Sequence, residues 1–262
     1  MWNLFKNAPV LSEEDRYFQI ECYKWLLKNF GGDHFYKDIQ LVLPSKEFFP
    51  DEIDSPEDAA QSVFNQVKNL AGLSDWPCKL EPQQEDPNSR VSPTILVNNV
   101  EHNPLGTFST NSENEVVITY NPKIVSTPTQ MIATFAHELS HYLTGYTKEP
   151  PPGGWENWEF ATDICATFLG FGIFQANSVF NFTQHTDVDS QGWQVSGGGY
   201  LSESEHSYAL AFFLLLKNIS PDIAYPHCDA NIKSILKNSI KEIEKSTVIE
   251  ELKNVEYVPE NV

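Results

Sequence analysis

Residues 127–145 read TPTQMIATFAHELSHYLTG, and the spacing of their apolar side chains predicts an amphipathic helix. Thr127, Pro128 and Gln130 predict a capping box at the start of this helix. On a helical wheel the main apolar side chains fall on one narrow stripe, which consists of Ile132, Phe135, Ala136, Leu139 and Leu143. We therefore expect the helix to turn this stripe toward a hydrophobic core.

The same helix carries an HExxH pattern, formed by His137, Glu138 and His141. Histidines at positions i and i+4 lie one turn apart on one helix face, so both imidazoles can reach one zinc ion, and the intervening glutamate can meet a zinc-bound water. Both histidines lie opposite the apolar stripe, so we expect them to face either solvent or a cleft. The motif alone leaves open the alternative of two surface histidines on an ordinary helix.

The next helix, expected over 155–176, carries Glu159 and Asp163 as an ExxxD pair, again opposite its apolar stripe. If the two helices face each other, Glu159 joins the two motif histidines as a third zinc ligand and leaves the fourth position to water, as in catalytic sites. Asp163, one turn further, can accept the free ring N–H of a ligating histidine. Glu156 is the rival third ligand, but it lacks a paired carboxylate one turn on.

HExxH followed by a helix with ExxxD resembles the gluzincin group of zinc metallopeptidases, over about residues 116–165. The resemblance implies a zincin-like fold, a Zn²⁺ cofactor, and peptide-bond hydrolysis by metal-activated water with Glu138 as general base. In such families the strand before the motif helix commonly lines the cleft and pairs with extended substrate, and Val116–Tyr120 is the matching segment. The metzincin pattern is absent, because Thr144 and Thr147 occupy its Gly and third His positions.

The donor that stabilises the oxyanion is expected to be a His or Tyr, because no arginine follows Arg90 and no lysine lies between 149 and 216. The candidates are His206, Tyr208, Tyr200, His185 and His227. The main alternative function is a zincin-like regulatory or binding protein that keeps the zinc site without peptide turnover. A structural helical protein with an accidental HExxH is the third hypothesis. The sequence specifies neither the natural substrate nor the oligomeric state.

Charge and composition restrict the partners. The chain of 262 residues has 17 Lys+Arg against 36 Asp+Glu and a net charge of −19, which argues against nucleic acid and an anionic membrane surface as partners. A peptide or protein is the expected substrate. The four cysteines form no CxxC pair, no secretory start is visible, and the apolar run 164–180 is broken by glycines. These features predict reduced thiols, no membrane span and a cytoplasmic protein.

The pattern along the chain predicts an α+β, zincin-like fold, with a small sheet in the N-terminal half and a mainly helical C-terminal half that carries the metal helix. A single metallopeptidase domain is expected over 1–250, with 251–262 as a candidate tail. The remaining expected helices are 12–30, 55–73, 201–218 and 229–245, the expected strands are 38–43 and 116–120, and 83–115 is expected to be mostly loop.

Overall fold

The α+β class with a small sheet in the N-terminal half is confirmed by the computed structural model, which describes residues 8–50, 55–83, 104–111, 113, 115–186 and 201–259. In chain order the α-helices are α1 (Glu13–Phe30), α2 (Pro56–Leu70), α3 (Pro128–Thr144), α4 (Trp158–Ala166), α5 (Gly172–Thr186), α6 (Glu203–Leu216), α7 (Pro221–Ala224), α8 (Ala230–Ile243) and α9 (Val248–Lys253). The strands are β1 (Lys79–Pro82), β2 (Gly106–Thr110) and β3 (Val116–Tyr120). Shorter turns of 3₁₀-helix occupy Pro122–Ser126, Trp155–Asn157 and Tyr225–His227, and π-helical turns occupy His34–Asp38 and Thr167–Phe171.

The described strands form one sheet of order β1-β3-β2, in which β1 is parallel and β2 antiparallel to β3. Side chains of β3 alternate in burial, and Val116, Ile118 and Tyr120 are its buried positions. Because β3 pairs with a strand on each side, its backbone has no edge left for a substrate. The expectation that Val116–Tyr120 would pair with substrate is therefore wrong, and among the described strands β1 and β2 form the two edges of the sheet.

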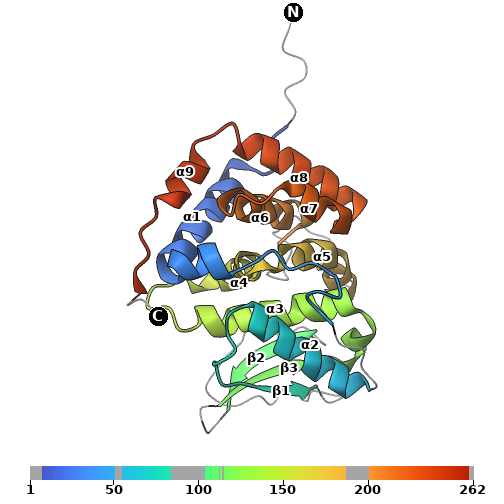
Figure 1. Ribbon diagram of the computed structural model, residues 1–262. Helices are drawn as coiled ribbons and strands as arrows, with labels where there is room; N and C mark the ends of the chain where they lie inside the picture. The colour runs from blue at the N-terminus through green and yellow to red at the C-terminus, as the bar shows by residue number, and fades with distance from the viewer. Residues whose placement is uncertain are drawn as a thin grey trace, which may run out of the picture.

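Helix α3 is buried on both faces, between the sheet with α2 and the helices of the C-terminal half (Figure 1). On the sheet side, Phe135 makes edge-on ring contacts with Phe64 of α2 and Tyr120 of β3, at centroid distances of 5.4 and 5.9 Å. The opposite face, with His137 and His141, packs against α4. The two histidines are only 4% and 7% exposed. Protein therefore covers both the apolar face of the helix and the opposite face that carries the histidines.

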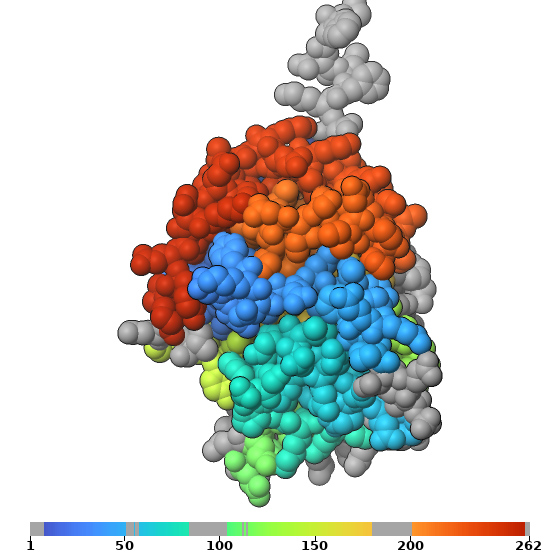
Figure 2. Space-filling model, in the orientation of Figure 1, coloured from blue at the N-terminus to red at the C-terminus, as the bar shows by residue number. Residues whose placement is uncertain are grey.

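Helix α1 joins the C-terminal layer although it comes first in the chain. Tyr23 donates a hydrogen bond of 2.7 Å from its buried hydroxyl to the carbonyl of Ala209 in α6. Figure 2 shows the N-terminal segment lying between the C-terminal helices and the segment that contains α2. Within the candidate tail, α9 continues to residue 253 with Leu252 buried, and Val258 donates its N–H to the carbonyl of Lys28.

The apolar run 164–180 is helical with a glycine break, as predicted, and Gly170 has a φ of +99° in the π-helical turn. The predicted strand 38–43 is wrong, because this segment carries no strand and packs against that break. Val42 donates its N–H to the carbonyl of Gly170 at 3.0 Å, while Ile39, Leu41 and Val42 are buried. The apolar run at 38–43 therefore reflects burial against a helix rather than sheet pairing.

Two further expectations need correction. The stretch 83–115, expected to be mostly loop, contains strand β2, whose sequence GTFST has too few apolar residues to show the alternation of a strand. Residues 84–103 of the stretch lie outside the described part of the chain. The capping box at Thr127 does not form, because a 3₁₀ turn leads directly into α3 and leaves Thr127 with a ψ of 82° instead of the extended value. A capping box forms instead in α6, between Ser202 and Glu205.

All four cysteines lie in the described part of the chain, and none forms a disulfide. Among the described helices, none has the length and hydropathy needed to cross a bilayer.

Candidate metal centre

Three ligand-type atoms converge where α3 packs against α4. The Nε2 atoms of His137 and His141 lie 3.0 Å apart, and Oε2 of Glu159 lies 3.3 Å from the first and 3.1 Å from the second. Within the described residues this is the group of His, Cys, Asp or Glu that could hold a metal ion, and the rival Glu156 is not part of it. The helical spacing brings the two imidazoles together, and the packing of α4 on α3 supplies the carboxylate.

The three distances fit a small ion with nitrogen and oxygen ligands. Tetrahedral zinc with bonds of about 2.0–2.1 Å needs ligand atoms that are roughly 3.3 Å apart. The ligand atoms of His137, His141 and Glu159 are separated by nearly that distance. The two histidines are buried, whereas the side chain of Glu159 is 46% exposed, so the group opens to solvent on the side of α4.

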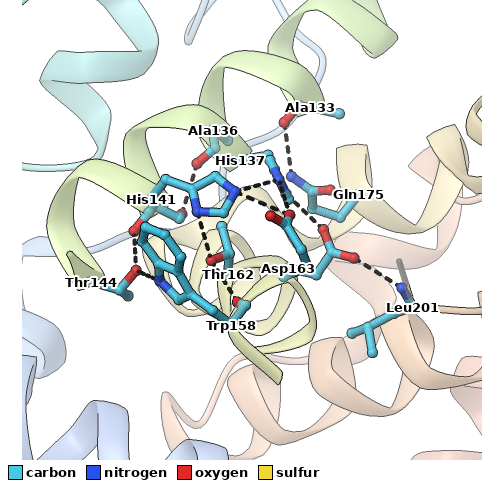
Figure 3. Close-up of polar contacts among 12 residues, drawn as sticks. Ala133, Ala136, His137, His141, Thr144, Trp158, Thr162, Asp163, Gln175 and Leu201 are labelled. Carbon is cyan, nitrogen blue, oxygen red and sulfur yellow. Dashed lines mark hydrogen bonds and ion pairs between the residues drawn. The ribbon is translucent and has the colours of Figure 1, made fainter. Parts of the chain in front are cut away.

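The outer nitrogen of His137 is held by Asp163, as the sequence predicts. Nδ1 of His137 lies 2.9 Å from Oδ1 of Asp163, whose other oxygen accepts the backbone N–H of Leu201 at 2.9 Å (Figure 3). Asp163 is 2% exposed and belongs to α4, while Leu201 precedes α6. With Nδ1 protonated toward Asp163, Nε2 is left as the lone-pair nitrogen that points at the centre.

The partner of the second histidine was not expected from the sequence. The Thr162 hydroxyl donates to the carbonyl of Trp158 at 2.8 Å, so it accepts the Nδ1–H of His141, which lies 3.3 Å away (Figure 3). The Trp158 ring stands edge-on to His141 at 4.6 Å, and its indole N–H donates to Thr144. Thr162 lies three residues after Glu159 on the same face of α4, and this spacing was the available signal.

Glu138 lies against the edge strand. The residue is 6% exposed, and a methyl group built on Gly106 of β2 would come within 2.8 Å of its Oε1. The backbone of β2 therefore approaches α3 as closely as it does because residue 106 has no side chain. This role of Gly106 was also missed, although a glycine inside a strand is a known sign of close backbone approach.

Burial and neighbouring charges shift the pKa values at this centre. Burial raises the pKa of the Glu138 carboxyl above its ordinary value, against the opposing effect of the two histidines. Burial alone lowers the pKa of His137, but its hydrogen bonds to Asp163 and Glu159 outweigh this and raise it well above 6.5. The same bonds, from both histidines, hold the pKa of Glu159 far below its usual range although burial acts in the other direction.

The candidate oxyanion donors lie in different places. His206 is buried with its Nε2 3.6 Å from Oδ2 of Asp163, the residue that also contacts His137. The Tyr208 hydroxyl donates to Glu242 at 3.2 Å, away from the centre. His227 lies in the 3₁₀ turn before α8, and its backbone carbonyl accepts a hydrogen bond from the side-chain amide of Asn177.

The other two candidates cannot be placed as side chains, since Tyr200 lies outside the described residues and only the helix, not the side chain, is described at His185.

No protein-family model matches the chain, and comparisons with curated proteins and with solved structures found no match.

Proposed function

We propose that the protein is a zinc-dependent metallopeptidase of the gluzincin type, with a zincin-like fold. The observation that carries this proposal is the convergence of His137, His141 and Glu159 next to an intact Glu138. A structural zinc is usually enclosed by four protein ligands, whereas three ligands with a partly exposed third leave a position for water. This favours an enzyme over the alternative of a regulatory or binding protein that keeps the site without turnover.

In this proposal His137, His141 and Glu159 hold Zn²⁺, and Asp163 and Thr162 fix the ring orientations. When bound, the ion supplies Lewis-acid chemistry and lowers the pKa of water to near 7. Glu138 accepts the proton of the attacking water and later donates it to the leaving nitrogen. The raised pKa of its buried carboxyl suits both steps, because a general base works best when its pKa lies near the working pH.

Among the described strands none pairs with the outer edge of β2, and an extended peptide would lie along that edge. Backbone bonds between Asn121 and Leu105 and between Asn111 and Glu115 bracket the β2–β3 ladder. In an antiparallel pair, hydrogen-bonded and non-bonded positions alternate, so residues 106, 108 and 110 direct their N–H and C=O groups away from β3. A substrate strand added there would pass Gly106, next to Glu138, by β-augmentation.

Zinc content and peptide turnover test the proposal together. The purified protein should contain about one zinc per chain. Substitution of His137, His141 or Glu159 by Ala should abolish zinc binding, and Glu138→Gln should retain zinc and lose turnover by 10²-fold or more.

Wild-type and Glu138→Gln proteins, both zinc-loaded, are then compared on a broad peptide library. Cleavage by the wild type alone would support a peptidase. Equal inactivity of the two would reject it in favour of the regulatory alternative, and the absence of zinc from the wild type would leave the structural hypothesis.

A further inference from the structure

His206 is a buried histidine that the proposed chemistry does not use. It lies in the second turn of α6, where the capping box of Ser202 and Glu205 fixes the start of the helix. The side chain is 4% exposed, and its Nδ1 has no hydrogen-bond partner among the residues that the structure describes. Leaving a buried polar atom unsatisfied is unfavourable, so such an atom in a native interior calls for a physical reason.

The other nitrogen of His206 faces Asp163. Its Nε2 lies 3.6 Å from Oδ2, the same oxygen that accepts the Leu201 N–H, while Oδ1 faces His137. A distance of 3.6 Å is an electrostatic contact rather than a hydrogen bond. Both oxygens of Asp163 are thus oriented, one toward the metal ligand and one toward α6.

The charge state of His206 follows from its surroundings. Burial lowers the pKa of the ring, against the opposing effect of Asp163, so the ring is neutral and carries one N–H. The Asp163 carboxylate favours that proton on Nε2, because the ring dipole then points its positive end at the negative charge. The lone pair of Nδ1 is left without a donor on the far side, which accounts for the unsatisfied atom.

We propose that His206 is a positioning residue that acts through Asp163 on His137 and thereby tightens metal binding. This inference rests on the metal site of the proposed function but not on its peptidase activity. Partners that orient a ligating histidine typically contribute 10–100-fold to metal affinity. Helix α6 would then be coupled to the metal centre by a side chain that touches neither the ion nor any of its ligands.

The first test measures metal affinity by competition with a chromophoric chelator, using Zn²⁺ and Co²⁺ as probes. His206→Phe keeps a buried ring and removes both nitrogens, and we expect it to weaken metal binding about 10-fold. His206→Gln can place an amide N–H near the position of Nε2 and should stay within about threefold of wild type. Ser207→Ala is the matched control, since Ser207 is the next residue on α6, is also buried, and has a hydroxyl with no partner in the described part of the chain.

A double-mutant cycle distinguishes action through Asp163 from a general loosening of the fold. If His206 acts through the carboxylate, His206→Phe should have no further effect on metal affinity in an Asp163→Asn background. Effects of the two substitutions that multiply independently would overturn the proposal. So would wild-type affinity in a folded His206→Phe protein, or an equal loss of affinity in Ser207→Ala.

A measurement on the wild type keeps the proposal testable if His206→Phe fails to fold. A long-range ¹H–¹⁵N spectrum of the metal-free, ¹⁵N-labelled protein reports which ring nitrogen of His206 carries the proton. We expect Nε2–H, and an Nδ1–H tautomer would overturn the proposal. A wild type that binds metal but cleaves no peptide would reject the proposed peptidase while the affinity differences at His206 still stand.

Discussion

Gly106→Ala is the substitution for which the structure gives the sharpest expectation. A Cβ at this position would lie 2.7 Å from Cγ2 of Thr134, 2.8 Å from Oε1 of Glu138 and 3.0 Å from its Cγ. Real Cβ contacts are not that short, so either β2 must move away from α3 or both side chains must give way. The Glu138 carboxylate can rotate, but then it leaves the place from which it would take a proton.

The expected magnitudes follow from these contacts. Overpacking a well-packed site by one methyl group costs about 1–3 kcal/mol of unfolding free energy. For a chain of this size, each kcal/mol lowers the melting temperature by roughly 2–4 °C. Displacement of Glu138 should reduce kcat/KM by about 10²-fold or more, because positioned acid–base groups typically contribute 10²–10⁴-fold. Metal binding should persist, since none of the three contacts involves His137, His141 or Glu159.

The assay combines thermal unfolding, zinc content and turnover of a peptide found by the library screen. Ser109→Ala is a suitable control on the same strand, because Ser109 lies an odd number of residues from Gly106 and therefore points to the opposite face of the sheet. A Gly106→Ala protein with wild-type stability and turnover would refute the close approach of β2 to Glu138. Loss of zinc together with turnover would show that the strand supports the ligands rather than Glu138.

Three further predictions concern backbone strain and protons. Gly170→Ala should lower the unfolding free energy by about 3 kcal/mol or more, measured by denaturant titration, because φ is +99° and a Cβ would fall on the Gln40 carbonyl. In the metal-free protein, Glu138→Gln should raise the melting temperature at pH 8 and not at pH 3. The reason is that the pKa of the Glu138 carboxyl is higher in the folded than in the unfolded state, so the wild type loses stability as the pH rises through the folded-state value. Zinc binding near pH 7 should release a proton from His137, whose pKa lies well above 6.5. Calorimetry in buffers of different ionisation enthalpy should detect this proton release, and the affinity for zinc should fall as the pH is lowered.

The candidate metal centre could be predicted from sequence to the extent that helical spacing determines it. His137 and His141 share a helix face by periodicity alone, and Glu159 and Asp163 share a face of the next helix in the same way. The contact between these faces was an inference from matching patterns, and the packing of α4 on α3 brings the ligand atoms together. Such local geometry is encoded within a few turns of chain and needs no knowledge of the rest of the fold.

What the sequence could not provide depends on segments far apart in the chain. Whether β3 is central or at an edge depends on β1 and β2, whose short polar sequences give no clear strand signal. The Leu201 N–H that holds Asp163 comes from 38 residues away and is a backbone group, which no motif records. The prediction of a strand at 38–43 was wrong for the same reason, because apolar periodicity indicates that a segment is buried but not which element it packs against.

The short separation along the chain between the ligands has a consequence for the order of folding. His141 and Glu159 are 18 residues apart, and closing so short a loop carries a small entropic penalty. The contact between Asp163 and Leu201 closes a loop of 38 residues and requires α6 to dock. If the centre binds zinc as proposed, a chain that has formed α3 and α4 but has not yet docked α6 should already bind the ion, at reduced affinity. Folding in the presence of zinc should then show a fast capture phase that precedes a slower tightening phase.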